Sequence, residues 1–421
     1  MNKNQYPKLL ILTPEDIYTT NSSAYFTIRS LIGRIPEENV FQVLCGGKSS
    51  GVGKIDEHHF LLNINDIIGG RFFRMGMTKK QKPAVRQISD IVRGKKNKHS
   101  ISSWIKSKVV DIYQFLPCRI PKELVSFVSE SGIDVIYTSS SRPRMILLMG
   151  TLCDKLKLYS LPHFLDDWPN IAFENTWVLK SVFNKKLNRI IKNSTYCLCI
   201  SHAMCEEYRV RYNYNRFIPL MHTVPAFMGF YEKRNQSVSL LYAGSIYLGR
   251  YETLKRLCEV VRKNAINDIC INIYTQEDAW NQLKSEFEKY EFVNYGGFIG
   301  QEELMTQIRE SDGLLFFESF DEEILKYTKL SLSTKVPEYL SSGIPIFAVG
   351  NATQGSIKYL SDNKAAYVAT DDSQIESVFL DFIAHKDVDT VLKNAKKLFH
   401  DNHEMKNQQE QFKQILQKSL S

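Results

Sequence analysis

The sequence predicts an α/β protein made of two doubly wound domains with parallel sheets. Short apolar runs recur along the whole chain, and segments with helical periodicity separate them, which is the pattern of repeated βαβ units. The runs are almost continuously apolar, as expected for strands covered on both faces. A length of 421 residues is too great for one hydrophobic core and indicates two domains.

The predicted strands fall into two series separated by one break. The first series is KLLILT (8–13), FQVLCG (41–46), DVIYTS (134–139), the stretch around LPHFL (161–165) and YCLCIS (196–201). The second series is SLLYAGS (239–245), CINIYT (270–275), FVNYGG (292–297), GLLFFE (313–318), PIFAVG (345–350) and AAYVAT (365–370). Between them, residues 217–237 contain two prolines and then a polar stretch. We therefore expect domains at residues 1–225 and 226–390, with a polar tail helix over 391–421 that packs back on the N-terminal domain.

The composition is that of a soluble globular protein, with 43% apolar and 24% charged residues. No apolar run approaches the ~18 residues of a membrane-spanning helix, and the N-terminal run ends at Pro14. We expect a cytoplasmic protein. Eight cysteines are too few for a disulfide scaffold.

A group of cysteines raises the question of zinc. Cys197, Cys199, His202 and Cys205 lie close together in the sequence. Alternation along the predicted strand places Cys197 and Cys199 on one face, whereas zinc ligands usually come as CxxC pairs. We favour buried thiols over a metal site and predict no metal.

Residues 71–122 form a basic segment, with 14 Lys or Arg against two acids, interleaved with aromatic residues. The segment carries a net charge of +12, whereas the whole chain carries only +8. A solvated surface, a nucleic-acid site and an anionic membrane surface would each suit this charge. We favour the membrane, because no nucleic-acid-binding module accompanies the segment, and we expect no nucleic-acid partner.

Two segments of the second domain carry polar residues suited to binding an anion. In YAGSIYLGR (242–250), Gly244 and Ser245 follow a predicted strand and Arg250 begins a predicted helix, an arrangement that suits a phosphate group. A glycine that merely turns the chain is the alternative.

In STKVPEYLSSGIPIFAVG (333–350), Ser333 and Thr334 precede a predicted helix whose first turn holds Lys335 and Glu338. Glu338 complements the helix dipole, but Lys335 does not. Both charges make sense if the lysine meets phosphate and the carboxylate accepts hydroxyl hydrogen bonds.

The first domain offers two candidate segments. HFLDDWPN (163–170) places Asp166, Asp167 and Trp168 after a predicted strand, where the acids could orient or deprotonate a hydroxyl. A turn anchored by Trp168 is the alternative. Asn21 and Ser22, in the loop after the first strand, are weaker candidates, because a capped helix start also explains them.

These segments together resemble the GT-B glycosyltransferases, especially bacterial enzymes of surface-polysaccharide assembly such as capsule and O-antigen synthesis. STKVPEYLSSGIPI resembles their donor-site helix, YAGSIYLGR their diphosphate loop, and HFLDDWPN the DDW element of a subset. The resemblance implies two Rossmann-like domains facing across a cleft, no metal cofactor, and Glu338 as the second glutamate of the E-x7-E motif, which holds the donor ribose. The first glutamate would fall at Leu330, so the usual contact with the sugar is in doubt.

The resulting hypothesis is a glycosyltransferase, leaning toward retention of configuration, that is peripheral on the inner face of the plasma membrane. A UDP- or GDP-type nucleotide diphosphate sugar would bind to seven residues of the second domain: Gly244, Ser245, Arg250, Ser333, Thr334, Lys335 and Glu338. A glycan or polyprenyl-diphosphate-linked acceptor would bind near Asp166, Asp167, Trp168, Asn21 and Ser22. The alternatives are a GT-B sugar-nucleotide 2-epimerase and a non-catalytic binding protein, which Leu330 suggests.

Overall fold

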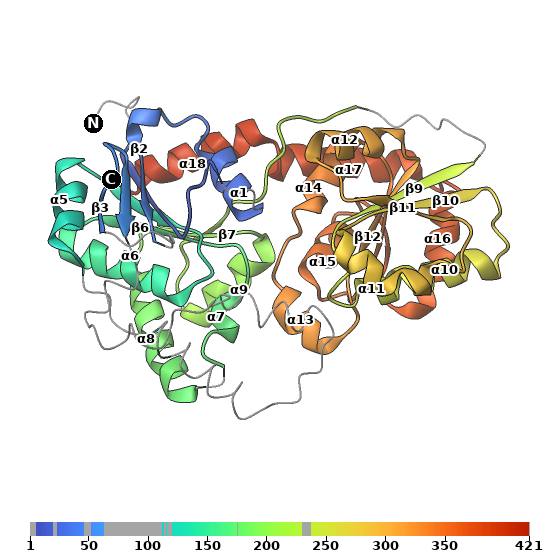
Figure 1. The fold of residues 1–421 in the computed structure, drawn as a ribbon, viewed down its shortest axis with the longest axis horizontal. Helices are drawn as coiled ribbons and strands as arrows, with labels where there is room; N and C mark the ends of the chain where they lie inside the picture. The colour runs from blue at the N-terminus through green and yellow to red at the C-terminus, as the bar shows by residue number, and fades with distance from the viewer. Residues whose placement is uncertain are drawn as a thin grey trace. The chain divides into compact units, whose positions relative to one another are not determined.

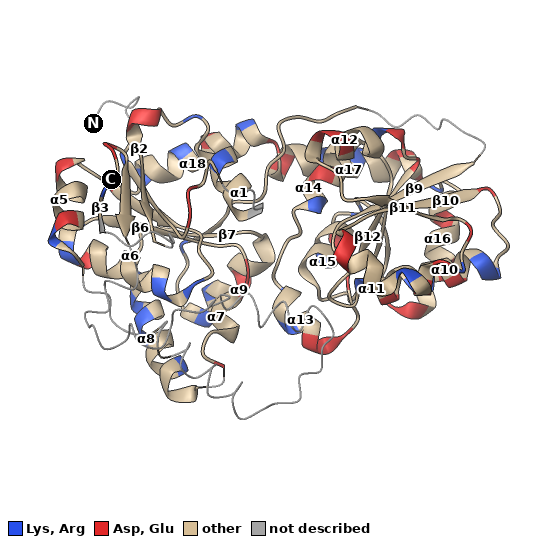
Figure 2. Ribbon diagram, viewed as in Figure 1, with Lys and Arg blue, Asp and Glu red and all other residues tan. Residues whose placement is uncertain are grey.

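The computed structural model describes residues 6–19, 23–45, 52–62, 112, 115, 120–174, 176–229 and 237–420. The chain divides into two compact units. The first contains the described residues up to Thr223 and those from Met405 onward, and the second runs from Val224 to Glu404. Each unit has one sheet with helices around it (Figure 1). Charged residues lie mainly on helices and loops rather than on strands (Figure 2).

The first unit contains an eight-stranded sheet in the order β3-β4-β2-β1-β5-β6-β7-β8. Its strands are β1 (Leu9–Thr13), β2 (Val40–Leu44), β3 (Val52–Lys54), β4 (His59–Leu62), β5 (Val135–Thr138), β6 (Tyr159–Phe164), β7 (Cys197–Cys199) and β8 (Phe217–Pro219). Neighbouring strands are parallel except for β3, which is antiparallel to β4. Only residues 55–58 connect β3 to β4, which suits a hairpin, because parallel strands need a longer crossover.

The helices of the first unit include one contributed by the end of the chain. They are α1 (Ser23–Ile32), η1 (Glu37–Asn39), α5 (Lys122–Glu130), α6 (Pro143–Leu156), α7 (Trp168–Ile171), α8 (Trp177–Asn193), α9 (His202–Tyr212) and α18 (Met405–Lys418). Phe412 and Leu416 of α18 are buried in the cluster that α1 and the sheet form. The Gln409 side chain donates a hydrogen bond of 2.7 Å to the carbonyl of Ser30 in α1. The last helix is therefore an integral part of this core.

The second unit contains a six-stranded parallel sheet in the order β11-β10-β9-β12-β13-β14. Its strands are β9 (Val238–Ala243), β10 (Ile269–Tyr274), β11 (Val293–Gly297), β12 (Gly313–Phe317), β13 (Ile346–Val349) and β14 (Tyr367–Ala369). Its helices are α10 (Arg250–Lys263), α11 (Glu277–Phe287), α12 (Gln301–Glu310), α13 (Glu322–Thr328), α14 (Lys335–Ser342), α15 (Gly355–Asp362), η3 (Asp372–Gln374), α16 (Ile375–Ile383) and α17 (Val388–Asn402).

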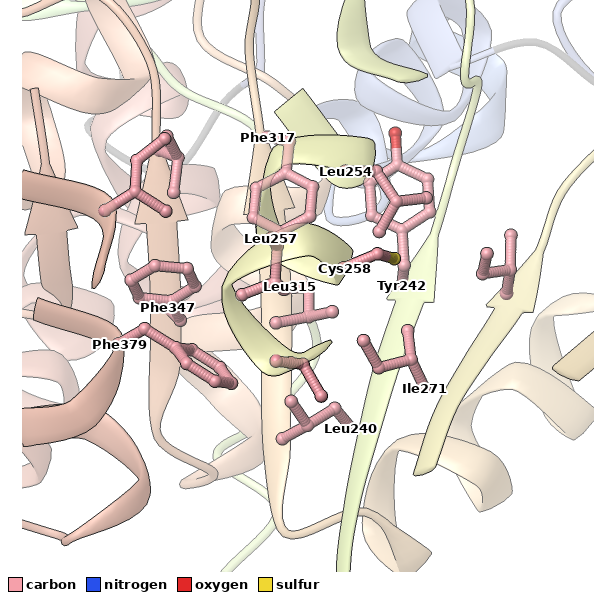
Figure 3. Close-up of a cluster of buried hydrophobic side chains, with 14 of the residues drawn as sticks. Leu240, Tyr242, Leu254, Leu257, Cys258, Ile271, Leu315, Phe317, Phe347 and Phe379 are labelled. Atoms are coloured by element: carbon pink, nitrogen blue, oxygen red, sulfur yellow. The ribbon is translucent and has the colours of Figure 1, made fainter. Parts of the chain in front are cut away.

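The core on one face of this sheet holds the central strands and α10 together. Leu240 and Tyr242 of β9, Phe317 of β12 and Leu257 of α10 are almost completely buried in it (Figure 3). Burying a large apolar side chain contributes about 1.5–3 kcal/mol. The ends of β9 and β12, from which the loops discussed below begin, are thus held by a well-packed core.

The structure confirms the predicted fold class, because each of the eleven predicted apolar runs overlaps a strand. β3, β4 and β8 were not predicted, and β8 lies within the segment interpreted as a break between domains. Phe217 in β8 is buried, so this short strand completes the first sheet before the chain leaves it. The expected tail helix is instead parts of two helices, α17 in the second unit and α18 in the first.

Candidate functional site

The second sheet has a topological switch point between β9 and β12. The strand that starts the unit, β9, pairs with β10 on one side and with β12 on the other. In open α/β sheets, ligands bind in the crevice outside the carboxyl ends of the strands at such a point. Gly244 directly follows β9, and Glu318 directly follows β12. Residues from both loops therefore lie at the carboxyl ends of the two strands that flank the switch point.

The loop after β9 needs glycine at two positions. Gly244 has φ +150° and Gly249 has φ +70°, values that L-residues rarely adopt. A Cβ on Gly249 would also lie 2.5 Å from Ser319 Oγ, whereas a Cβ on Gly244 would have no heavy atom within 4 Å. Ser245 closes the turn, since its Oγ accepts a hydrogen bond of 3.2 Å from the backbone N–H of Tyr247.

Arg250, predicted to meet a diphosphate, forms an ion pair with Glu318 in this structure. Arg250 Nε donates to Glu318 Oε2 at 3.1 Å, and Nη2 donates to Oε1 and Oε2 at 3.0 and 2.9 Å. The side chains are 20% and 2% exposed, respectively. Burial alone would lower the pKa of Arg250, but the charge and hydrogen bonds of Glu318 raise it above its usual value. The sequence alone gave no indication that Glu318 would be the partner of Arg250.

The first turn of α14 contains a second ion pair. Lys335 Nζ lies 2.7 Å from Glu338 Oε2, and Gln301 of α12 donates a hydrogen bond of 3.1 Å to Glu338 Oε1. The two charged side chains are 25% and 14% exposed. Glu338 is therefore held between two helices rather than capping one, and both of its oxygens already have a donor.

Ser333 and Thr334 precede α14, but the N-cap residue, Thr334, makes no side-chain hydrogen bond to the first turn of the helix. Ser333 Oγ instead accepts a hydrogen bond of 3.3 Å from the N–H of Lys335, and the N–H of Ser333 donates to Ser356 Oγ at 3.0 Å. The helix ends at Gly343, which has φ +73°.

Tyr339 connects α14 to the loop after β9. Its hydroxyl accepts a hydrogen bond of 3.2 Å from the backbone N–H of Ala243, the residue before Gly244, and Tyr339 is buried. The two segments predicted separately from the sequence thus meet at one strand end. A tyrosine in an apolar helical pattern gave no signal of this contact. Leu330, at the position of the missing motif glutamate, is 7% exposed and so places a packed apolar side chain there.

In the first unit, the two neighbouring aspartates have different surroundings. Asp167 is buried, and its Oδ1 accepts hydrogen bonds from the Tyr208 hydroxyl at 2.8 Å and from Arg211 at 2.6 Å. Arg211 also donates to Oδ2 at 3.0 Å. Burial acts to lower the pKa of Arg211, but its contacts with Asp167 raise it. Both carboxylate oxygens of Asp167 therefore have donors within the unit, whereas Asp166 is exposed just after β6.

The third residue of this element, Trp168, is an anchor for the core. It is 6% exposed and stacks on Phe164, with ring centroids 6.2 Å apart. This matches the structural alternative weighed for Trp168. The other predicted acceptor residues, Asn21 and Ser22, lie outside the described residues, as does nearly all of the basic segment 71–122.

The cysteines and His163 are packed into the first core. Cys197, Cys199 and Cys205 are buried, and burial raises the pKa of the Cys197 and Cys199 thiols. No group of three or more His, Cys, Asp or Glu suited to a metal ion occurs in the described ranges. His163 accepts a hydrogen bond of 2.8 Å from the Tyr137 hydroxyl and donates one of 3.0 Å to the carbonyl of Leu220. Burial lowers its pKa to about 4.

Comparison with solved structures extends over the whole chain. A glycosyltransferase from Rickettsia africae ESF-5 aligns with 99% of each chain, at a TM-score of 0.60 and 10% identity. HepE from Anabaena, solved in complex with UDP-glucose, aligns over 97% of this chain and 99% of its own, at a TM-score of 0.56 and 10% identity. WaaG, a glycosyltransferase of lipopolysaccharide biosynthesis, aligns over 97% of this chain and 99% of its own, at a TM-score of 0.57 and 11% identity. The chain has the GT-B fold.

Sequence comparison adds a match for the second unit. Residues 246–414 match the family described as glucosyltransferase 3-like, C-terminal domain. This range contains Arg250, Glu318, Lys335 and Glu338 and amounts to less than half of the chain. A comparison with curated proteins gives no match. Among the helices that the structure describes, none is long and apolar enough to cross a membrane.

Proposed function

We propose that this GT-B protein is a glycosyltransferase that uses a nucleotide diphosphate sugar. The observation that carries the proposal is the Tyr339–Ala243 contact, which joins α14 to the end of β9 at the switch point of the sheet. Both segments present helix N-termini and a cation, which suit a diphosphate. The match of residues 246–414 to a glucosyltransferase family and the UDP-glucose complex of HepE support a donor of the UDP-sugar type.

Donor binding would rearrange the Lys335–Glu338 ion pair. A diphosphate near α14 adds negative charge beside Lys335, so the ammonium group would turn toward the phosphate oxygens. That turn frees Glu338 Oε2, 2.7 Å from Lys335 in this structure, to accept hydrogen bonds from the ribose hydroxyls. Arg250 would add a second charge while Glu318 holds its guanidinium in place. Gly244, Ser245, Ser333 and Thr334 would line the same pocket.

In the transfer step, the bond between the anomeric carbon and the β-phosphate oxygen breaks, and its electron pair leaves with the nucleoside diphosphate. The acceptor hydroxyl oxygen bonds to that carbon on the face from which the diphosphate leaves, and its proton passes to the departing β-phosphate oxygen. Lys335, Arg250 and the helix amides would stabilise the charge that develops on the leaving diphosphate. We assign the acceptor side to Asp166, which is exposed, rather than to Asp167. We propose a hexosyl donor, retention of configuration and a lipid-linked or glycan acceptor of surface-polysaccharide synthesis at the inner membrane face.

Calorimetric titration with UDP, 2′-deoxy-UDP, GDP and pyrophosphate tests the donor site. If Glu338 accepts ribose hydroxyls, the wild type binds UDP about 10- to 100-fold more tightly than the deoxy compound, because hydrogen bonds to a charged group contribute about 1.5–3 kcal/mol. Glu338→Ala abolishes this preference but leaves pyrophosphate binding in place, because Lys335 remains.

The exposed Glu302 on α12 provides a matched control, and Glu302→Ala should bind all four ligands as the wild type does. Wild-type protein that binds none of the nucleotides at millimolar concentration would overturn the donor-site assignment. If the protein instead changes the configuration at C2 of a sugar nucleotide when no acceptor is present, the 2-epimerase alternative is favoured.

A further inference from the structure

The outward side of α8 combines exposed apolar residues with several exposed cations. Trp177, Val178 and Val182 are 79%, 50% and 37% exposed, and all lie in the first six residues of the helix. The remainder of the outward face carries Lys185, Lys186, Arg189 and Lys192, which are exposed. The helix contains no acidic residue (Figure 2). This combination is unusual on a helix of a globular protein.

The periodicity of α8 separates this face from the one that packs on the unit. Phe183, Leu187 and Ile191 recur every four residues and are completely buried. Gly150 of α6 lets the two helices approach closely, since a Cβ there would lie 2.6 Å from Ile190 Cγ1. At 100° per residue, Val178, Val182, Lys185, Arg189 and Lys192 project on the opposite side, and Trp177 and Lys186 lie at the two edges of that side. The fold therefore fixes which side of α8 meets its surroundings.

The charged groups around this face leave it strongly basic. Arg189 pairs with Asp154 of α6 at 3.1 Å, but both side chains are more than half exposed, so the pair is weak. Lys186 Nζ lies 4.6 Å from the ring centroid of Phe115, which also packs edge-on against Phe173 at 5.9 Å. Phe115 belongs to the basic segment 71–122. Lys186 at the edge of the α8 face thus contacts one residue of that segment, Phe115.

We infer that the outward face of α8 binds an anionic lipid surface. Trp177, Val178 and Val182 would enter the headgroup region, where an aromatic ring with a polar N–H is favoured. The four cations farther along the helix would lie against anionic headgroups, each strengthening binding about fivefold. A protein partner would need an apolar patch matched by acids, whereas a membrane offers both features without a specific fit. The inference locates the membrane contact of the proposed function on a described helix, and it can be tested without any sugar transfer.

Co-sedimentation of the full chain with phosphatidylcholine vesicles, with and without phosphatidylglycerol, tests this inference. The wild type should bind only the anionic vesicles, and added salt should weaken binding. The Lys185→Ala/Lys186→Ala variant should bind about 25-fold more weakly, and Trp177→Ala about tenfold more weakly. These side chains are exposed, so unchanged circular dichroism and melting should accompany both losses.

Matched controls come from the second unit. Lys393→Ala/Lys397→Ala removes the same charge from exposed positions of α17, and Phe298→Ala removes an aromatic side chain that is 74% exposed. Both should bind vesicles as the wild type does.

Wild-type protein that does not bind anionic vesicles, or α8 variants that bind as tightly as the wild type, would overturn the inference. Preference for a nucleic-acid duplex over anionic vesicles would overturn it too. Failure here would leave nucleotide binding unaffected, so it is distinct from failure of the donor site.

Discussion

The Arg250–Glu318 ion pair is the feature of the candidate site whose removal has the most clearly defined cost. Glu318 is 2% exposed and accepts three hydrogen bonds from Arg250, at 2.9 to 3.1 Å. The variant Glu318→Gln keeps the shape of the side chain but removes its charge. The guanidinium group of Arg250 then stays largely buried without a counter-charge.

The expected destabilisation follows from the burial of the two groups. Removing one partner of a fully buried ion pair costs about 3–5 kcal/mol. Arg250 retains 20% exposure, so water compensates for part of this loss, and we expect about 2–4 kcal/mol. For a unit of this size, each kcal/mol shifts Tm by about 2–4 °C, so the midpoint of the second unit should fall by roughly 4–16 °C.

Differential scanning calorimetry of the full chain, with a double-mutant cycle, measures this effect. Arg250→Met should cost about as much as Glu318→Gln, because it leaves a buried carboxylate. The double variant Arg250→Met/Glu318→Leu should cost much less than the sum of the single variants, because it leaves neither charge unpaired. Asp372→Asn removes the same kind of charge from the exposed Arg256–Asp372 pair and should shift Tm by 2 °C or less.

Two results would refute this reasoning. The first is a Glu318→Gln midpoint within about 2 °C of the wild type, which would mean that solvent satisfies Arg250. The second is strict additivity in the cycle, which would mean that the two side chains do not stabilise each other despite their hydrogen bonds.

The first unit gives two further predictions. Asp167→Asn should lower the free energy of unfolding by about 2–3 kcal/mol, because Arg211 loses its counter-charge, whereas Asp166→Asn should change stability little and slow sugar transfer. Thermal denaturation alongside a transfer assay separates these roles, and an Asp167→Asn protein of wild-type stability that lacks activity would contradict them. Burial lowers the pKa of His163 to about 4, so below about pH 6.5 the unfolded chain binds a proton that the folded chain does not. The free energy of unfolding therefore decreases as the pH is lowered. From pH 7 to 5 this amounts to about 2 kcal/mol, and the wild type's advantage over His163→Gln in urea denaturation should shrink by that amount; an unchanged difference would show that His163 does not titrate as inferred.

The local signals that predicted the strands were strong because the sheet strands are buried on both faces. A strand such as LLILT over 9–13 has every residue buried, so its apolar character appears directly in the sequence. β8 was missed because three residues containing a proline leave little signal. The long tail was predicted as one helix because nothing in its polarity marks where the chain passes from α17 to α18.

The sequence by itself determined the alternation of strands and helices, the two-domain organisation and the two segments that form the candidate donor site. Glycines such as Gly244 and charges such as Lys335 and Glu338 are visible as residue types at the start of helices. The tertiary structure alone decided which partners these charges have. Glu318 lies 68 residues from Arg250, and Tyr339 lies 96 residues from Ala243. Such contacts depend on the order in which parallel strands assemble, which local periodicity does not encode. For the same reason the sequence treated Asp166 and Asp167 alike, and only the fold buried one of them against Arg211 and left the other exposed.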